Sequence, residues 1–363
     1  MLFTCSAAGA TLPGRFPGTK RARGQHRTVD IHCHVHCVAA AEMVKTIFRA
    51  EVEPSLHFAS EHTRATNREQ GQRIAPQLTS VEKRLADMDT MGIDIQALAP
   101  SPSQTYYWTE PDVGLATARA VNDNIAAIVA AHPDRFVGMG TVPLQAPKLA
   151  VAELDRIVKT LGFRGVEINT NIAGEDLAAE RFRPFFARAE ELGVVVFIHP
   201  IGFTEGRRLT EHYFNNVIGN PMESTIAVSH LIFGGVLEAC PHLKVVVAHG
   251  GGYLPAYAAR MDHAAEARPD CCVHLKHMPT TYLKRLHFDT IVFSADQLEF
   301  LVQKYGADHI LLGTDYPYDM GENDPIGFIE GAKLDPADRK AIMGENAARL
   351  LAIEVQAAKM KAD

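Results

Sequence analysis

The sequence predicts a (β/α)8 TIM barrel, in which eight parallel strands form a closed ring and helices cover its outside. The first observation behind this prediction is that short runs rich in β-branched residues alternate with amphipathic helical patterns along the chain. The second is that the polar exceptions within these runs are histidines and acids near the C-terminal ends. Barrel enzymes build their active sites at that end of the strands.

The eight expected strands are short apolar runs bounded by turn residues. In chain order they read TVDIHCH from residue 28, IDIQALAP from 93, RFVGMGTVP from 135, GVEINTN from 165, VVVFIHP from 194, KVVVAHGG from 244, LHFDTIV from 286 and ILLGTDYP from 310. Each run is too short for a typical helix, and most are rich in valine and isoleucine, as buried parallel strands are.

Helical patterns separate these runs. At residues 80–92, 115–133, 149–162 and 183–193, apolar residues recur every three or four positions. Such alternation favours a closed parallel barrel. An open doubly wound sheet is the alternative, but its first strand is usually followed by a glycine-rich phosphate loop, and this chain reads HCHVHC there.

Two connections are longer than a barrel requires. Residues 38–79 and 201–230 follow the first and fifth strands, and both leave C-terminal strand ends, so we expect them to shape a substrate pocket. The barrel is expected to be a single domain over residues 28–363. Residues 1–27 differ because they carry basic residues and no acid, which indicates a mobile N-terminal extension.

The composition narrows the classes of function. The formal net charge is −7 and the charges of both signs are interspersed, so no surface for nucleic acid or anionic lipid is indicated. No stretch approaches the roughly 20 apolar residues of a membrane span. The six cysteines show no disulfide-framework spacing. We therefore expect a cytoplasmic protein that acts on a small molecule.

The first strand carries the strongest chemical signal. Alternation along a strand turns His32 and His34 into the barrel, while Ile31 and Cys33 face the helices. Two inward imidazoles about 7 Å apart along the strand can hold one ion, and a metal offsets the cost of burying them. His36 lies beyond the strand end, although a shifted pair of His34 and His36 also fits the spacing.

Two further residues complete a ligand set at the same mouth of the barrel. His199 ends the fifth strand and Asp315 lies on the eighth. Three imidazoles and one carboxylate suit Zn²⁺ with an open position for water, and Mn²⁺ is the alternative. The fourth strand offers Glu167, Asn169 and Asn171 but no lysine. A carbamylated lysine that bridges two metals cannot form there, so one ion is expected.

His249 follows the sixth strand and precedes three glycines, which allow a tight turn and a close approach of ligand to backbone. We expect it to act as a general acid and base beside a metal-bound water. The alternatives are a fourth histidine ligand and a hydrogen-bonded core residue.

Longer motifs carry a family resemblance. These are VDIHCH, PDRFVGMGTVPLQAPKLAVAEL, LGFRGVEI, FIHP, GNPMESTIA, GGVLEACPHLKVVVAHGGGYLP and LLGTDYPYDMGE. With them the chain, from about residue 28 to about residue 353, resembles the aminocarboxymuconate-semialdehyde decarboxylase-like family of the amidohydrolase superfamily. The resemblance implies that His32, His34, His199 and Asp315 bind zinc and that His249 is the catalytic acid and base.

The resemblance also implies substrate-binding residues. Arg260, in AARMDHA, is similar to a family arginine that reaches into the neighbouring subunit's site and holds a substrate carboxylate, which implies a homodimer. Trp108, together with Tyr107, resembles an aromatic pair that follows the second strand in this family.

The chain also departs from the decarboxylase for which this family is named. That enzyme has tryptophan after the histidine-proline of the fifth strand, whereas this chain has Ile201. Its second carboxylate-binding arginine lies in the first insertion, where this chain has Arg64, Arg68 and Arg73 and the pattern singles out none of them.

The expected reaction is the non-oxidative decarboxylation of a carboxylated muconate semialdehyde or a hydroxylated aromatic acid. The metal lowers the pKa of its water, His249 takes or returns that proton, and protonation of the carbon that bears the carboxylate lets CO2 leave. No organic cofactor is expected. The alternatives are a metal-dependent hydrolase or hydratase, since fold and ligands fix the reaction only loosely, and a non-catalytic zinc-stabilised binding protein.

Overall fold

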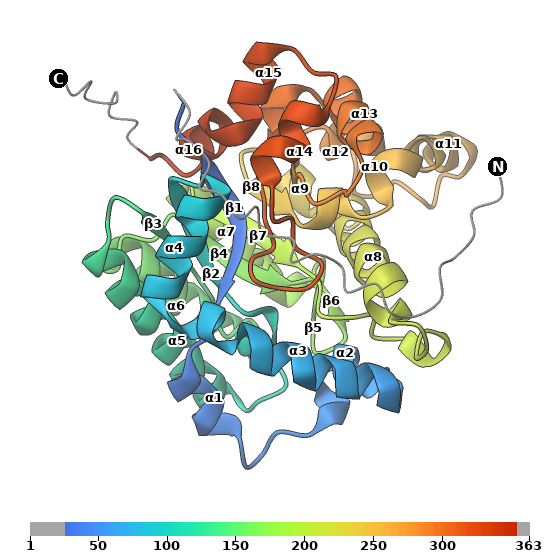
Figure 1. Cartoon of the computed structure of the whole chain (residues 1–363). Coiled ribbons are helices and arrows are strands. Elements are labelled where there is room, and N and C mark those ends of the chain that lie inside the picture. Colours follow the sequence, from blue (N-terminus) through green and yellow to red (C-terminus); the bar gives the residue numbers. More distant parts are fainter. Residues whose placement is uncertain (1–25, 354–363) are drawn as a thin grey trace.

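The computed structural model describes residues 26–353. The N-terminal extension expected over residues 1–27 lies almost entirely outside the described residues and stays a prediction. Figure 1 shows strands at the centre of the molecule with helices around them. The eight central strands are β1 (Val29–Val35), β2 (Ile95–Pro100), β3 (Phe136–Gly140), β4 (Gly165–Asn169), β7 (Val195–His199), β8 (Lys244–Val247), β9 (His287–Asp289) and β10 (Ile310–Leu311).

These strands form a parallel ring. Their order is β1-β2-β3-β4-β7-β8-β9-β10, and each neighbouring pair is parallel. The ring closes on β1, because the N–H of Ile31 donates to the carbonyl of Leu312 at 2.9 Å and the N–H of His34 donates to that of Tyr316 at 2.8 Å. The predicted (β/α)8 barrel is confirmed. A small antiparallel ribbon of β5 (Asn171–Ile172) and β6 (Glu175–Asp176) follows β4.

The last strand is shorter than expected. Regular pairing ends at Leu311, and the backbone N–H groups of Thr314 and Asp315 then both donate to the carbonyl of His32, at 3.2 and 2.8 Å. Asp315 has a φ of 52°, a left-handed conformation that a strand cannot continue through. The bend keeps Asp315 next to the first strand.

The helices cover the ring and its C-terminal mouth. They are α1 (Val38–Val44), α2 (Pro54–His57), α3 (Glu61–Thr79), α4 (Val81–Met91), α5 (Pro111–Ala131), α6 (Pro147–Lys159), α7 (Arg183–Leu192), α8 (Asn220–Phe233), α9 (Val236–Ala239), α10 (Leu254–Tyr257), α11 (Ala259–Ala267), α12 (Pro279–Leu283), α13 (Ala295–Tyr305), α14 (Pro325–Gly331), α15 (Pro336–Lys340) and α16 (Asn346–Leu350). The four predicted helices correspond to α4, α5, α6 and α7. The ends of α4 show why it was recognisable, since Ser80 caps its first turn and Gly92 ends it with a φ of 77°.

The apolar core has two layers, one inside the ring and one between the ring and the helices. Phe197 belongs to the inner layer and its neighbour Ile198 to the outer one, as strand alternation requires. The expectation that Ile31 and Cys33 share the outer face is wrong for Ile31, which lies in the inner layer. The register of β1 shifts between Asp30 and Cys33, and such an irregularity reverses which side chains face inward.

Both predicted insertions are present at the C-terminal mouth. Residues 38–79 contain α1, α2 and α3, and residues 201–230 contain two short turns and most of α8. The insertions touch, because the N–H of Ser60 donates to the carbonyl of Thr210 at 2.9 Å.

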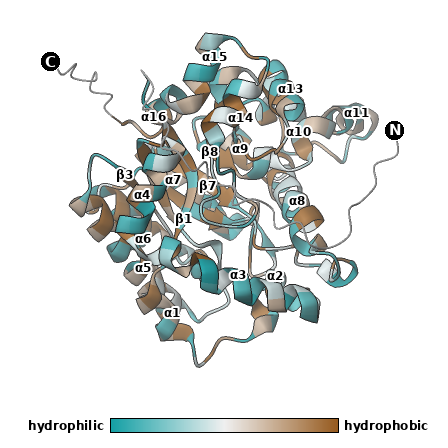
Figure 2. Ribbon diagram, viewed as in Figure 1, coloured by the Kyte–Doolittle hydropathy of each residue, from teal (hydrophilic) through white to brown (hydrophobic). Residues whose placement is uncertain are grey.

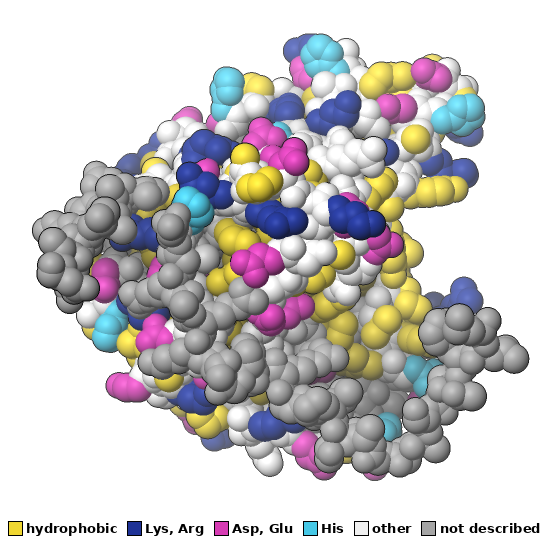
Figure 3. Space-filling view, turned by 45° about the horizontal axis from the view of Figure 1, so that its top comes forward, with side chains coloured by type: hydrophobic (Ala, Val, Ile, Leu, Met, Phe, Trp, Pro, Cys, Tyr) yellow, Lys and Arg dark blue, Asp and Glu magenta, His cyan; other side chains and the backbone are white. Residues whose placement is uncertain are grey.

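The surface is of mixed character. Figure 2 shows hydrophilic residues on the outer helices and hydrophobic residues towards the central strands. On the face drawn in Figure 3, acidic and basic side chains are interspersed. Within residues 26–353, none of the helices has both the length and the apolar character needed to cross a membrane.

Candidate metal centre and active site

Five side chains converge at the C-terminal mouth of the barrel. β1 carries His32 and His34, β7 ends in His199, and the segments after β8 and β10 carry His249 and Asp315. The neighbouring imidazole rings have centroids 4.9 to 5.2 Å apart. The structure therefore brings together the five residues that the sequence singled out as metal ligands and as the acid and base.

Three of the donor atoms are spaced like ligands of one ion. Nε2 of His32 lies 3.1 Å from Nε2 of His34, and Oδ1 of Asp315 lies 3.3 Å from each of these nitrogens. Ligand atoms that lie 2.0–2.2 Å from one ion are about 3.0–3.5 Å from each other. The spacing of the three atoms matches such a shell.

His199 adds a donor that has no other partner. Both of its ring nitrogens, and Oδ1 of Asp315, are buried without a hydrogen bond. Buried polar atoms of this kind cost free energy unless something satisfies them. His32, His199, His249 and Asp315 also each offer an atom within 4.8 Å of the others. The residues present fit a divalent ion.

The outer ring nitrogen of each β1 histidine, Nδ1, contacts a hydrogen-bond acceptor on the side away from the centre. Nδ1 of His32 lies 2.6 Å from Oδ2 of Asp289, and Nδ1 of His34 lies 2.9 Å from the carbonyl of Pro100. Each Nδ1–H donates to its acceptor, which leaves Nε2 as the atom of each ring that is directed at the centre. His36 lies beyond the end of β1.

The electrostatics of the centre favour positive charge. Burial by itself lowers the pKa of His32, but Asp315 and Asp289 outweigh burial and raise it to about 10. Burial lowers the pKa of His34, and burial with the neighbouring imidazoles holds that of His199 well below its usual range. Burial raises the pKa of Asp315, but the adjacent histidines, His32 first, hold it well below its usual range. An ionised carboxylate beside imidazoles, in a centre that stabilises positive charge on His32, suits a cation.

His249 occupies the more open side of this centre. Its side chain is 13% exposed and its Nε2 lies 3.6 Å from Oδ2 of Asp315, whereas the side chains of His32 and His34 are fully buried. His249 has a φ of 56°, a costly conformation that is frequent at functional sites. Its N–H donates to Asp289 at 2.9 Å. An imidazole in this position can contact both an ion held by the other four residues and a bound substrate.

Comparison with known proteins gives the family. The family model described as amidohydrolase matches residues 29–353. The chain belongs to the amidohydrolase family. It is 35% identical over 345 residues to 2-amino-3-carboxymuconate-6-semialdehyde decarboxylase of Dictyostelium discoideum, a match that covers 94% of this chain and 90% of that protein. It is 28% identical over 287 residues to gamma-resorcylate decarboxylase of Rhodococcus jostii (strain RHA1), a match that covers 75% of this chain and 87% of that protein.

A solved structure shares the fold. Dihydroxybenzoic acid decarboxylase from Polaromonas sp. JS666, with bound manganese and the inhibitor 2-nitroresorcinol, superposes with a TM-score of 0.77 at 23% identity, over 90% of this chain and 97% of that one. Both of the relatives named above are decarboxylases, which confirms the expected class of enzyme, a carboxy-lyase of the amidohydrolase superfamily. The ion in that neighbour is manganese, and zinc in this chain stays a prediction.

In this amidohydrolase the fourth strand places a carboxyl group behind the centre. Glu167 is completely buried, and its Oε2 lies 3.7 Å from Nδ1 of His34. Neither of its oxygens has a hydrogen-bond partner. Burial raises the pKa of Glu167 well above its usual range and so favours the neutral form of the group. It faces the outer nitrogen of His34, the side away from Nε2.

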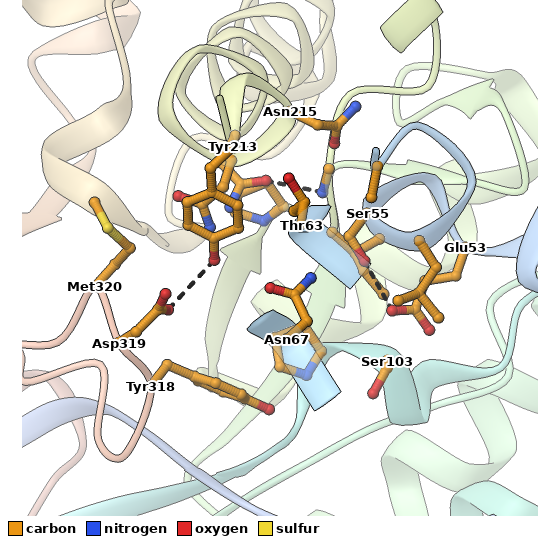
Figure 4. Close-up of a pocket in the computed structure, with 18 of the residues that line it drawn as sticks. Glu53, Ser55, Thr63, Asn67, Ser103, Tyr213, Asn215, Tyr318, Asp319 and Met320 are labelled. Atoms are coloured by element: carbon orange, nitrogen blue, oxygen red, sulfur yellow. Dashed lines mark hydrogen bonds between the residues drawn. The ribbon is translucent and has the colours of Figure 1, made fainter. Parts of the chain in front are cut away.

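A cavity of about 260 Å³ opens onto His199, His249 and Asp315. Both insertions supply its walls, as expected. Figure 4 shows side chains of α3, of the second insertion and of the loop after β10 around the same space. From α3 the cavity receives one helical stripe, Thr63, Asn67, Gln70 and Ile74.

A second cavity of about 450 Å³ adjoins the first. Glu53, Phe58, Ser103 and Ile201 line both. Trp108 lines only the second, so the structure places this expected substrate-binding residue beside the metal cavity and not within it. Ile201, the departure from the family tryptophan, lies where the two cavities meet.

The expected substrate-binding arginines lie outside the metal cavity of their own chain. Arg64, Arg68 and Arg73 are exposed on α3 and none lines either cavity. Arg260 is exposed on α11, where it borders a separate apolar recess with Tyr257.

Two residues of the site were missed from the sequence. Asp289 ends β9, and its place at a strand end, like that of the other site residues, was the available signal. Asp319 lies in the loop after β10 and lines the metal cavity. Nothing in the pattern of that loop predicts where its side chain points.

Proposed function

We propose that this amidohydrolase is a metal-dependent decarboxylase of a conjugated or aromatic carboxylic acid. The observation that carries the proposal is the position of His249, which lies between the cluster of His32, His34, His199 and Asp315 and a cavity of about 260 Å³. The decarboxylase names of the relatives support the reaction class.

The proposed ligands are the four members of that cluster, with one zinc or manganese ion. Such an ion would act as a Lewis acid that stabilises negative charge developing on the substrate. The chain's own contribution is to hold each donor with its lone pair turned inward, through Asp289 behind His32 and the Pro100 carbonyl behind His34.

His249 is the proposed acid and base. It donates a proton to the carbon that bears the carboxylate, the C–C bond to that carboxylate breaks, and the bonding electrons return to the conjugated system as CO2 leaves. His249 then regains a proton from solvent, so the net reaction consumes one proton for each CO2 released. Asp315, 3.6 Å from Nε2 of His249, orients the ring.

Arg260 supports a proposed homodimer. The described lining of the metal cavity contains no lysine or arginine, and Arg260 lies exposed beside an apolar recess on α11. In the proposed dimer, Arg260 of a second copy pairs with the substrate carboxylate. Mixing inactive His249→Asn and Arg260→Ala subunits should restore activity, because one of the two sites in a mixed dimer then holds both intact residues. Failure to restore it in a confirmed mixed dimer contradicts the shared site.

The reaction is tested by trapping CO2. Protein loaded with zinc or manganese is incubated with carboxylated muconates and hydroxybenzoates, and released CO2 is measured with the metal-free protein and His249→Asn as controls. We expect CO2 release that needs both the ion and His249. Hydrolysis or hydration of these or related compounds without CO2 contradicts the proposal and favours the corresponding amidohydrolase reaction instead.

A further inference from the structure

The backbone around Asp315 determines where its carboxylate lies. Asp315 has a φ of 52°, which is uncommon for a residue other than glycine and persists where the surroundings fix it. Its Oδ1 lies 3.3 Å from Nε2 of both His32 and His34 and accepts no hydrogen bond from the described residues. The position of this donor atom therefore depends on contacts made by the neighbouring backbone.

Thr314 fixes that backbone on both sides of Asp315. The N–H of Thr314 donates to Oδ1 of Asp30 at 3.1 Å, and its hydroxyl donates to Oδ2 of Asp30 at 2.6 Å. The same hydroxyl accepts the N–H of Tyr316 at 3.2 Å. One threonine side chain thus ties the residue before Asp315 and the residue after it to Asp30, on the first strand of the barrel.

Asp30 connects this segment to the backbone of His32. Its Oδ1 also accepts the N–H of His32 at 3.1 Å, in the part of β1 where the register is irregular. The carbonyl of His32 in turn accepts the N–H groups of Thr314 and Asp315, at 3.2 and 2.8 Å. Asp30 and Thr314 therefore join the backbones of two proposed metal ligands, His32 and Asp315.

The hydrogen bonds continue to the second histidine of β1. Nε2 of Gln96, on β2, donates to Oδ2 of Asp30 at 3.0 Å, and Oε1 of Gln96 accepts Nη1–H of Arg84, on α4, at 3.0 Å. Nη2–H of Arg84 donates to the carbonyl of His34. Asp30, Gln96, Arg84 and Thr314 are all buried. Loss of one member of a buried network leaves its partners unsatisfied, so each contact matters more than it would in water.

We infer that Asp30 and Thr314 are positioning residues of the metal centre, which set the spacing between the Asp315 carboxylate and the two β1 imidazoles. The inference rests on the ligand set of the proposed function. Neither Asp30 nor Thr314 lines the metal cavity, and neither supplies a donor atom to the cluster. Each acts through the backbone of the ligands, so a change at this pair should alter the geometry around the ion without removing a ligand.

The matched variants Thr314→Val and Thr314→Ser test this inference. Valine has nearly the shape of threonine but lacks the hydroxyl, whereas serine keeps it. Asp30→Asn alters the other partner. Thr117→Val is the control, because Thr117 is also completely buried and its hydroxyl donates only within its own helix, α5. Each protein is loaded with Co²⁺, whose visible absorption reports the coordination geometry, and its Zn²⁺ affinity is measured by competition with a chromophoric chelator.

We expect Thr314→Val and Asp30→Asn each to weaken Zn²⁺ binding roughly tenfold or more and to shift the Co²⁺ spectrum. Thr314→Ser and Thr117→Val should keep the affinity and the spectrum of the unaltered protein. The double variant should lose little more affinity than either single variant, because the two residues act through one connection.

The inference is overturned if Thr314→Val keeps both the affinity and the spectrum, if Thr314→Ser loses as much as Thr314→Val, or if Thr117→Val changes both equally. A role in stability alone predicts an unaltered Co²⁺ spectrum in every variant that folds, and urea unfolding of the metal-free proteins measures the stability separately. Thr314→Ala removes the hydroxyl without placing a methyl group against Asp30, and it takes the place of Thr314→Val if that variant does not fold.

Failure of the inference differs from failure of the proposed function. If His199→Ala binds the ion as tightly as the unaltered protein, the proposed ligand set is wrong and the inference fails with it. If the unaltered protein releases CO2 from a carboxylic acid but Thr314→Val keeps the affinity and the spectrum, only the inference fails. If Thr314→Val alters both but no acid is decarboxylated, the inference stands and the decarboxylase assignment is lost.

Discussion

Oδ2 of Asp289 lies 2.6 Å from Nδ1 of His32 and also accepts the backbone N–H of His249 at 2.9 Å. One buried carboxylate therefore orients a proposed metal ligand and the proposed acid and base. Burial alone would raise the pKa of Asp289, but the contact with His32 keeps it lowered, so the group is ionised and accepts both hydrogen bonds at neutral pH.

The substitution Asp289→Asn should weaken metal binding by roughly 10- to 100-fold, because the group that fixes the His32 ring is altered while the ligands remain. Competition with a chromophoric chelator measures the affinity. Asp308→Asn removes an acid that is 68% exposed on the surface and serves as the control. An unchanged affinity in Asp289→Asn would show that the hydrogen bond does not support the ligand.

His249→Asn should lower the turnover rate by about 100-fold or more, because the general acid is lost. The variant should still bind one equivalent of metal. His199→Ala should instead reduce metal content, since it removes a proposed ligand. Metal analysis and CO2 release on the same preparations separate the two effects. Full activity in His249→Asn would show that His249 is not the general acid, whereas no turnover even in the unaltered protein would favour the non-catalytic alternative.

Glu167→Gln should leave metal affinity unchanged and stability within about 1 kcal/mol of the unaltered protein or slightly above it. Burial raises the pKa of Glu167 and so favours its neutral form, and glutamine has nearly the same shape as that form. Chelator competition and urea unfolding provide the two measurements. A large loss of metal would instead identify Glu167 as a ligand.

Removal of the metal should destabilise the protein, because the buried nitrogens of His199 and Oδ1 of Asp315 then have no partner. An ion present at 100 times its dissociation constant stabilises the folded state by about 2.7 kcal/mol. The melting temperature should therefore rise with the concentration of added zinc or manganese. His199→Ala should show a much smaller rise, and an equal rise in that variant would place the ion elsewhere.

Stability should fall on acidification through His287. Burial and the stacked His309 ring, 4.9 Å away, lower the pKa of His287 to about 4, against an unfolded value near 6.5. Above pH 6.5 both states are neutral and stability is full. Below it the unfolded state takes up a proton first, which costs about 2 kcal/mol by pH 5.

Urea unfolding at pH 7 and pH 5 tests this expectation. His287→Phe keeps a ring in the stack and should reduce the loss of stability between the two pH values, whereas His242→Gln, at an exposed position, should not. An equal loss in His287→Phe would assign the pH dependence to other groups.

Much of the barrel and its centre was predictable from the sequence. Period-two alternation with polar exceptions at strand ends is a local signal, and in a closed parallel ring all C-terminal strand ends meet at one mouth. The sequence therefore predicted that His32, His199 and Asp315 lie close together in space, although they are more than a hundred positions apart in the chain. The prediction was wrong where the strand is irregular. At Ile31, the register shift in β1 turned the side chain to the inside of the ring instead of towards the helices.

The amino-acid sequence by itself determined the ring of strands and the residues at their ends, and hence which donors form the candidate metal centre, because the alternation of side chains along a strand fixes the direction in which each one points. Only the tertiary structure decided what surrounds that chemistry. The rotation of α3 turned Asn67 and Gln70, and not the arginines, towards the cavity, and the loop after β10 placed Asp319 beside Tyr213. Such orientations follow from how insertions pack against the barrel, through contacts between distant segments that no local pattern encodes.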